Sequence, residues 1–307
     1  MSDLAAILLA HDNPAQVRRL IAALAGVELF LHCDVRTPQP VFAQMLEGAP
    51  PDLRALPRRR ADLFSWSLLE AELLALRAVL EQSRAEHIIV LSGSCYPLVS
   101  IEELREELAR WRGHTRLELK PLPYPPWSTP RNDDGGLWRV RRRFLTLRDR
   151  VVYLGPVPLR TSRVEPPREL RLHGGAHWKI YARAHASALL RVLGERPDLA
   201  AFWRHTLLPE ESAVHSILAS PELVGEIAET MIDDPVWYLD WAPPSRGRPA
   251  VHPRWLGRDE FDALVAARFA PPRPVGEPGD GYRKLFARKL SPDAPELAEL
   301  IDELRRV

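Results

Sequence analysis

The sequence has few cysteines and no long apolar segment. Its two cysteines, Cys33 and Cys95, stand inside apolar strand-like runs, which favours buried thiols of a reducing compartment over a disulfide. No apolar run approaches the roughly 18 residues that a membrane helix requires. The start, Met1-Ser2-Asp3, lacks the basic region typical of a signal peptide. These absences predict a soluble, cytoplasmic protein without a membrane span.

Lysine is scarce as well. Only four of the 42 basic residues are lysines, and 30 residues are prolines, a bias that indicates codon composition. The few lysines are therefore not explained by a general abundance of lysine. The net charge is +1, so no global field favours a nucleic acid or a membrane surface as partner.

Several motifs of known chemistry are absent. The sequence has no G-x-G-x-x-G and no G-x-x-x-x-G-K-[ST], which argues against a dinucleotide fold and a P-loop. It has no G-x-S-x-G, so the His173-Gly174-Gly175 segment does not indicate a serine hydrolase. His173 and His177 suggest a metal, but the glycines between them and the lack of a nearby cysteine or acid argue against zinc.

What the sequence does contain is an alternation of apolar strands and amphipathic helices. Ala5–His11 is typical of a strand buried on both faces, and a helix carrying Val17 and Leu24 leads to a second strand, Glu28–Asp34. This opening predicts a parallel sheet whose ligands bind at the carboxyl ends of the strands, where His11 and Asp34 stand.

The remaining pattern predicts an α/β architecture. The length allows one large domain or two smaller ones. We expect helices over Leu68–Gln82, Ile101–Trp111, Ala184–Leu193, Asp259–Ala267 and Ala294–Arg306, strands over His87–Gly93, His173–Tyr181 and Asp234–Trp241, and an irregular segment over Thr37–Arg60.

The segment Leu207–Leu218 is a candidate for chemistry. Pro209 suits the first position of a helix, and Glu210 and Glu211 fall in the first turn, where the helix dipole favours a carboxylate. Val214 and Leu218 place Glu211 on or beside the apolar face. Glu211 is thus a candidate general base, with a simple helix-start preference as the alternative.

Two further segments allow both functional and structural interpretations. Arg139–Arg150 holds six arginines in twelve residues, and it fits binding of a sugar acceptor or an anionic group, a nucleic-acid patch, or a solvated face. The aromatic run around Trp237 and Trp241 fits either stacking against a sugar or packing in the core.

Taken in order, six motifs resemble the Core-2/I-branching β-1,6-N-acetylglucosaminyltransferase and peptide O-xylosyltransferase family, in a bacterial-type form. The resemblance covers nearly the whole chain outside residues 115–164, and its most specific motif is the last. The motifs are Ala10-His11, His32-Cys33-Asp34, Ser65-Trp66-Ser67, Leu91–Leu98, Pro209-Glu210-Glu211 and Leu285-Phe286-Ala287-Arg288-Lys289.

The resemblance implies a GT-A-like (Rossmann-like) glycosyltransferase fold with a mixed central sheet flanked by helices. It implies one domain over residues 1–307, with a nucleotide-sugar-binding half (1–120) and an acceptor/catalytic half (121–307). It also implies inverting transfer from a UDP-sugar without a metal or other cofactor. In agreement, the sequence has no Asp-x-Asp; Asp133-Asp134 and Asp233-Asp234 are adjacent pairs, which on a strand would face opposite ways.

The same resemblance implies roles for individual residues. Glu211 matches the catalytic base, although Glu210 stands where the family has aspartate. Lys289 matches the lysine that neutralises the diphosphate, with Arg254 as its partner and Arg258 or Arg288 as substitutes. The remaining candidates are His11, Asp34, Trp66 and Ser67 for the nucleotide, and Trp178, Trp237, Trp241 and Arg142 for the acceptor.

The donor sugar is expected to be N-acetylglucosamine or xylose, and the acceptor a glycan, a lipid-linked sugar or a small molecule. Two alternatives to an enzyme remain at this point. One is a nucleotide-sugar-binding protein without catalysis, which would not need Glu211. The other is a polyanion binder that uses Arg139–Arg150.

Overall fold

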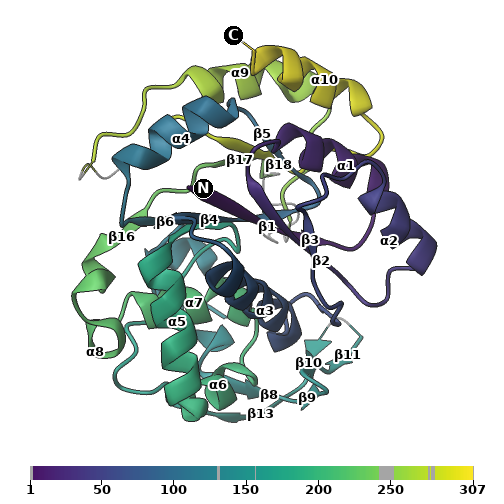
Figure 1. Cartoon of the computed structure of the whole chain (residues 1–307). Coiled ribbons are helices and arrows are strands. Elements are labelled where there is room, and N and C mark those ends of the chain that lie inside the picture. The colour runs from purple at the N-terminus through teal and green to yellow at the C-terminus, as the bar shows by residue number, and fades with distance from the viewer. Residues whose placement is uncertain are drawn as a thin grey trace.

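A mixed sheet forms the centre of the computed structural model, which describes residues 3–129, 132–155, 157–241, 252–275, 277 and 281–306. β1 to β4 of this sheet are parallel, whereas β15 runs antiparallel between β4 and β6. The strands in order across the sheet are β16 (Met231–Asp233), β6 (Thr115–Leu117), β15 (Lys179–Ala182), β4 (His87–Ser92), β1 (Leu4–Ala10), β2 (Glu28–Cys33) and β3 (Arg54–Ala55) (Figure 1).

Alternate residues of β1 supply two hydrophobic cores, one on each face of the sheet. Ala6 and Leu8 pack in the core shared with α1 (Pro14–Ala23), α4 (Ile101–Arg110) and α10 (Pro295–Leu304). Ile7 and Leu9 pack in the core shared with α3 (Trp66–Gln82), α5 (Arg183–Glu195) and α7 (Ala213–Leu218). Figure 1 shows these two helical layers on opposite sides of the sheet. The expected fold class is therefore confirmed: α/β, with a mixed central sheet flanked by helices.

A second, smaller sheet brings the C-terminal motif to the end of β4. It consists of β17 (Trp237–Leu239), β18 (Phe286–Arg288) and β5 (Cys95–Pro97), with β18 in the middle. β5 follows β4 after a short turn, and Arg288 pairs with Cys95 across the antiparallel ladder. The last residue of β18 consequently lies beside the carboxyl end of β4.

The other elements surround this frame. Helices are α2 (Gln39–Leu46), α6 (Pro197–Trp203), α8 (Pro221–Val224) and α9 (Phe261–Phe269). Two-stranded ribbons pair β7 (Lys120–Pro121) with β14 (His173–Gly174), β8 (Arg142–Phe144) with β13 (Arg160–Arg163), β9 (Thr146–Leu147) with β10 (Arg150–Val151), and β11 (Tyr153–Leu154) with β12 (Val157–Pro158). Within the described residues, the helices are too short or too polar to cross a membrane.

Most expected elements are present, with small shifts at their ends, but three expectations are wrong. The segment Thr37–Arg60 contains α2, because its prolines lie at the start of the helix, where they are tolerated. His173–Tyr181 is two strands in different sheets, β14 and β15, separated by residues 175–178. Asp234–Trp241 is reduced to the three residues of β17. Both cysteines are buried and unbridged, as expected.

Candidate active site

The turn that carries Glu211 is a 3-10 turn, η3 (Pro209–Glu211), and not the first turn of an α-helix as expected. Ser212 has φ −139°, which interrupts the helical path before α7 begins. Leu208, just before the turn, adopts a left-handed conformation with φ +56°. Pro209 opens the turn as predicted, and Val214 and Leu218 are buried as predicted. The glutamates thus stand on a short, separately fixed turn at the edge of the core.

Glu211 combines partial exposure with a raised pKa. Its side chain is 33% exposed, and its Oε2 lies 3.4 Å from Nη1 of Arg139. Burial raises the pKa of Glu211 to about 7, the positive charge of Arg139 opposes this rise, and the nearby Glu118 adds to it. A carboxylate with a pKa near neutrality that still reaches solvent suits proton transfer to and from a hydroxyl.

Arg139, in η2 (Leu137–Arg139), and Trp127, in η1 (Pro125–Trp127), form a wall beside Glu211. The guanidinium of Arg139 lies 5.0 Å from the centroid of the Trp127 ring. Gly174 lies against the same ring, since a Cβ at this position would be 2.6 Å from Trp127 and 3.2 Å from the carbonyl oxygen of Glu211. The sequence reasoning missed Trp127 and had Arg139 only as part of the arginine run.

Glu210 faces the protein interior instead. Its side chain is buried, and Oε1 accepts a hydrogen bond from the backbone N–H of Phe64 at 3.1 Å. Burial and the neighbouring Glu211 raise the pKa of Glu210 to about 8. Two adjacent carboxyl groups therefore have different surroundings, and of the two only Glu211 is partly exposed to solvent.

Arg288 and Lys289 lie near the carboxyl ends of β4 and β1. Arg288 donates hydrogen bonds to Ser92, the last residue of β4, and to Ser94 Oγ at 2.8 Å. Its guanidinium lies 4.1 Å from the centroid of the Trp178 ring. Burial lowers the pKa of Lys289, the charge of Arg288 lowers it further, and Asp12, just after β1, raises it. These two cations therefore lie at the edge of the sheet where parallel α/β proteins bind ligands.

Arg254 has a different setting from these two residues. Its backbone N–H donates to the carbonyl oxygen of Asp240 at 2.7 Å, and its Nη2 lies 2.5 Å from Asp240 Oδ2. Its charge is thus paired within the protein, although the next residue, Trp255, contacts Lys289, whose Nζ lies 3.8 Å from the ring centroid. Of these two arginines, Arg288 is the one whose side chain binds residues at the end of β4.

His11 and Asp34 directly follow β1 and β2, at the strand ends where they were predicted. The His11 side chain is 74% exposed and its Nε2 lies 3.4 Å from Asp12 Oδ2. Asp34 is buried and accepts hydrogen bonds from Arg36 and from the Ala61 backbone. Burial alone would raise the pKa of Asp34, but these hydrogen bonds lower it to about 2. Asp34 therefore holds the loop after β2 in place, and His11 offers the exposed side chain.

The other predicted residues divide between the site and the core. Trp178 lies in the site, where its ring contacts the guanidinium of Arg288 and stacks on the ring of His177, whose centroid is 4.8 Å away. Trp241 is 51% exposed. Ser67 is buried and accepts a hydrogen bond from the Asp62 backbone, and Trp66 is 3% exposed at the start of α3. These last two residues shape the loop before α3 and do not offer an open face.

One acceptor candidate needs correction. Trp237 is 3% exposed and stacks on Phe286 with ring centroids 5.1 Å apart, so the core alternative holds and no ring face is open to a sugar. The acceptor role expected for Arg142 stays a prediction: Arg142 lies on the β8–β13 ribbon, where its backbone pairs with Arg163, and Arg139 is the arginine of the run that contacts Glu211. The strand periodicity of β17 gave no sign of which aromatic residues would face the core.

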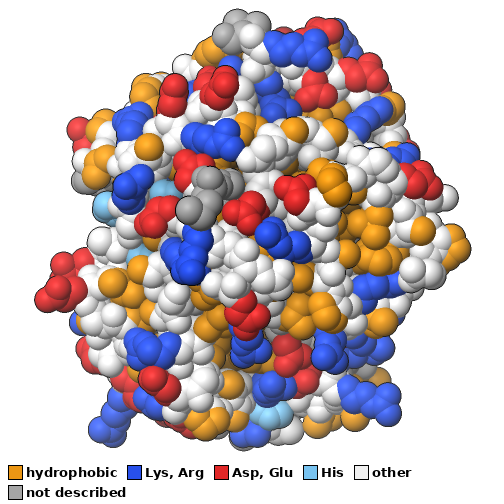
Figure 2. Space-filling view, in the orientation of Figure 1, with side chains coloured by type: hydrophobic (Ala, Val, Ile, Leu, Met, Phe, Trp, Pro, Cys, Tyr) orange, Lys and Arg blue, Asp and Glu red, His pale blue; other side chains and the backbone are white. Residues whose placement is uncertain are grey.

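The arginine run is not one uniform basic patch. Arg139 pairs with Glu211, and Arg150 lies 3.2 Å from Asp62. Figure 2 shows basic and acidic side chains interspersed on the face in view. Arg139 and Arg150 therefore have acidic partners within the protein, although Asp62 also pairs with Arg36 and Arg60.

A buried polar cluster beneath the site was also missed by the sequence reasoning. Glu72 of α3 accepts hydrogen bonds from Lys179 at 3.3 Å, from His177 at 2.7 Å and from Tyr181 at 2.5 Å. Lys179 is completely buried, as is Glu72. The scarcity of lysine in the chain was the one signal that could have singled out Lys179.

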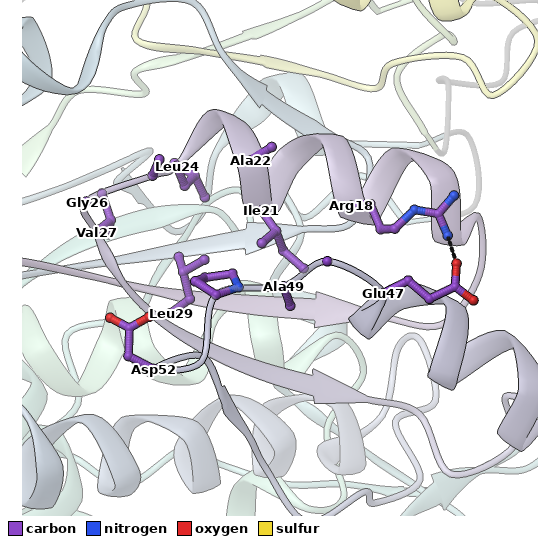
Figure 3. A pocket seen from close by; sticks show the side chains of 13 residues that line it. Arg18, Ile21, Ala22, Leu24, Gly26, Val27, Leu29, Glu47, Ala49 and Asp52 are labelled. Carbon is purple, nitrogen blue, oxygen red and sulfur yellow. Dashed lines mark hydrogen bonds and ion pairs between the residues drawn. The ribbon is translucent and has the colours of Figure 1, made fainter.

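A pocket elsewhere in the molecule lies away from these residues. It is formed by the C-terminal half of α1, the start of β2 and the loop after α2 (Figure 3). Ile21, Leu24 and Leu29 line it, and the Arg18–Glu47 ion pair lies at one side. Because it adjoins the amino end of β2, it is separate from the candidate active site. Within the described residues, no three His, Cys, Asp or Glu side chains gather as a metal site would require.

Comparison with known proteins gives a family match and distant structural likenesses. Solved structures similar to this chain include a protein assigned as a glucose-1-phosphate thymidylyltransferase from Bacillus anthracis, with 10% identity, a TM-score of 0.31, and 61% of this chain and 74% of that chain covered. Another is HddC from Yersinia pseudotuberculosis, with 12% identity, a TM-score of 0.30, and 60% and 78% covered. No curated protein matches by sequence.

The family match covers the part of the chain that holds the base candidate. The model of the Core-2/I-branching enzyme matches residues 28–265, more than half of the chain. Membership implies glycosyltransferase activity, with a sugar donor and an acceptor. The chain belongs to the Core-2/I-branching enzyme family.

Proposed function

We propose that this glycosyltransferase moves a sugar from a UDP-sugar to an acceptor hydroxyl with inversion and without a metal ion. The observation that carries the proposal is the position of Glu211. It is a partly exposed carboxyl with a pKa of about 7, on a turn bound to Phe64, whose ring stacks on His252 within electrostatic range of Arg288 and Lys289. A single displacement requires a base that takes the proton of the acceptor hydroxyl and cations that stabilise the charge of the leaving diphosphate.

The connection between the base turn and the cations runs through two aromatic residues. Phe64 donates its backbone N–H to Glu210, next to the base. The ring of Phe64 stacks on His252, with centroids 6.2 Å apart. Burial lowers the pKa of His252, and the charges of Lys289 and Arg288 lower it further, so His252 lies within electrostatic range of both cations. The base and the cations thus border one region of the molecule.

In the proposed reaction, Glu211 accepts the proton of the acceptor hydroxyl as that oxygen attacks the anomeric carbon. The bond from this carbon to the diphosphate oxygen breaks, and UDP leaves from the opposite face. Negative charge grows on the departing diphosphate, where Arg288 and Lys289 would stabilise it. Because a single displacement forms no covalent enzyme intermediate, one carboxylate is sufficient.

The finer assignments are part of the same proposal. The uridine would lie near His11 and the loop held by Asp34, because these residues follow neighbouring parallel strands. The sugar is proposed to be N-acetylglucosamine or xylose, and the acceptor to approach along Trp127, Arg139 and Trp178. Metal independence is supported by the two cations at the strand ends and by the lack of an Asp-x-Asp in the sequence.

A donor screen tests the proposal. The purified chain is incubated with UDP-N-acetylglucosamine, UDP-xylose and other UDP-sugars, each with and without EDTA, and UDP release is measured alongside UDP binding by calorimetry. We expect turnover with at least one donor and no loss with EDTA. Loss of activity in EDTA that is restored by a divalent ion would contradict metal independence.

The base assignment is tested by substitution of Glu211. Glu211→Gln should bind UDP normally and transfer at least about 10²-fold more slowly, because the amide cannot take a proton. Glu222→Gln is the matched control, since Glu222 lies on the exposed surface of α8 and pairs only at 3.5 Å with Arg171. Equal transfer rates in the Glu211 variant and the control would rule out the base role.

A further inference from the structure

Two residues in left-handed conformations hold the turn that carries Glu211 to the loop before α3. Phe64 has φ +64° and Leu208 has φ +56°, values that non-glycine residues seldom adopt. The Leu208 backbone N–H donates to the carbonyl oxygen of Phe64 at 3.4 Å. In return, the Phe64 N–H donates to Glu210 Oε1 at 3.1 Å. Such conformations persist only where the surroundings hold them, and here Glu210 supplies one of the two bonds.

The second oxygen of Glu210 is the unusual feature of this contact. Oε2 is buried and has no hydrogen-bond partner among the described residues. An ionised carboxylate offers about four acceptor sites, and here only the backbone N–H groups of Phe64 and of Glu210 itself serve them. A buried charge with so few donors is far less stable than the neutral acid.

The charged and titratable groups around Glu210 also bear on its charge. From its own turn, Glu211 opposes a second negative charge, whereas from β15 the ammonium of Lys179 favours it. Lys179, however, is already bound to Glu72 of α3. Tyr153 of β11 is close enough to be affected as well: burial raises the pKa of its phenol, and a negative charge on Glu210 raises it further. On balance the pKa of Glu210 is raised to about 8.

We propose that Glu210 is a positioning residue that acts as an uncharged carboxylic acid, holding Phe64 against the turn that presents Glu211. The neutral acid accepts the Phe64 N–H through its carbonyl oxygen and places no negative charge beside the base. Ionisation puts two carboxylates on adjacent residues and favours opening of the contact towards water. Phe64 also stacks on His252. Loss of the bond between Glu210 and Phe64 therefore also disturbs the side of the site that holds Lys289.

This inference rests on the proposed function for its effect on transfer, but not for its effect on stability. Adjacent carboxyl groups with different surroundings can take opposite roles, one ionised and one neutral. Activity should therefore fall at low pH as Glu211 becomes protonated, and fall at high pH as Glu210 ionises. Glu210→Gln mimics the neutral acid and cannot ionise, and so its decline at high pH should begin at a higher pH than that of the wild type.

The first experiment needs no substrate. A carboxyl whose pKa is higher in the folded than in the unfolded state stabilises the fold at low pH, and this stabilisation is lost as pH rises from about 4.5 to about 8. The Tm of the wild type should therefore fall relative to that of Glu210→Gln over this range. A constant difference in Tm across the range would overturn the proposal, because it would mean that Glu210 is ionised in the folded protein throughout.

The second experiment measures the pH dependence of kcat/KM. Glu210→Gln should keep the rate at pH 7 within about threefold of the wild type and shift the alkaline limb up by about one pH unit or more. Glu210→Ala removes the acceptor and should lower kcat by about tenfold or more, with UDP binding retained. Glu222→Gln, on the exposed face of α8, serves as the control.

The outcomes separate this inference from the proposed function. If Glu210→Gln is as inactive as Glu211→Gln, the carboxylate of Glu210 is itself required, and the inference is overturned. An alkaline limb that stays in place in Glu210→Gln overturns it too. If Glu211→Gln remains active while the Tm difference changes with pH as expected, the base assignment fails and the neutral state of Glu210 stands.

Discussion

Arg139 Nη1 lies 3.4 Å from Glu211 Oε2, and the two residues are 72 positions apart in the sequence. The arginine run and the base turn therefore meet at one wall of the site. The geometry gives Arg139 a definite electrostatic task, because its positive charge opposes the rise that burial causes in the pKa of Glu211.

Replacing Arg139 should shift the acid limb of the pH profile. In Arg139→Met the pKa of Glu211 should rise by about half a unit to one unit, since the carboxyl is partly exposed and screened by water. The base would then be ionised only at higher pH, so kcat/KM at pH 6.5 should fall severalfold more than at pH 8.5. Arg142→Met, on the β8–β13 ribbon, is the control. If it shifts the acid limb as much as Arg139→Met does, the shift comes from the loss of any positive charge and not from the contact between Arg139 and Glu211.

The three candidate cations should not contribute equally to the binding of UDP. Arg288→Ala and Lys289→Ala should each raise the Kd by about tenfold or more, because each removes a charge at the strand ends. Arg254→Ala should raise it by less than about threefold, since Asp240 already pairs with that guanidinium. Calorimetry at two salt concentrations measures these differences, and a larger loss in the Arg254 variant would reverse the assignment.

The strands and the residues at their ends could be predicted from the sequence, whereas contacts between distant turns could not. Local patterns identified β1, α1 and β2, because burial on both faces of β1 requires a continuous apolar run. They also placed His11 and Asp34 at neighbouring strand ends. The contact between Arg139 and Glu211 had no local signal, because it depends on how two distant turns pack. The burial of Trp237 was likewise undetermined, since an aromatic strand fits both a core and a sugar site.

The Glu72–Lys179 pair beneath the site should be important for stability. Lys179→Met leaves the carboxylate of Glu72 buried without its cation, which should cost about 3–5 kcal/mol of unfolding free energy. The double variant Lys179→Met/Glu72→Leu should lose less than the sum of the two single variants, because no uncompensated charge remains. Denaturant unfolding measures all three.

The control for these Glu72 and Lys179 variants is an exposed ion pair on α5. Arg191 Nη1 lies 3.0 Å from Glu195 Oε2, with both side chains about half exposed or more. Arg191→Met should cost less than about 0.5 kcal/mol, because solvent screens the pair. If the loss of unfolding free energy in the double variant equals the sum of the losses in the two single variants, a direct interaction between Glu72 and Lys179 would be contradicted.

The glycine pair before β15 should tolerate no side chain. A Cβ at Gly175 would stand 1.9 Å from the carbonyl oxygen of Glu118, and this backbone atom can move only if β6 or the segment after it moves. The same glycine donates its N–H to the carbonyl oxygen of Glu211 at 3.0 Å. Gly175→Ala should therefore destabilise the fold by about 2–4 kcal/mol and displace the base, lowering kcat more than UDP affinity.

Gly194 provides the matched control within the same chain. It lies near the C-terminal end of α5, and a Cβ built there meets no atom of the described residues within 4 Å. Gly194→Ala should be neutral or stabilise the protein by up to about 1 kcal/mol, because alanine loses less backbone entropy in a helix. Thermal unfolding and transfer kinetics of the two variants check the contrast. Similar stability in both would mean that the close approach of Gly175 to Glu118 does not constrain the turn that carries Glu211.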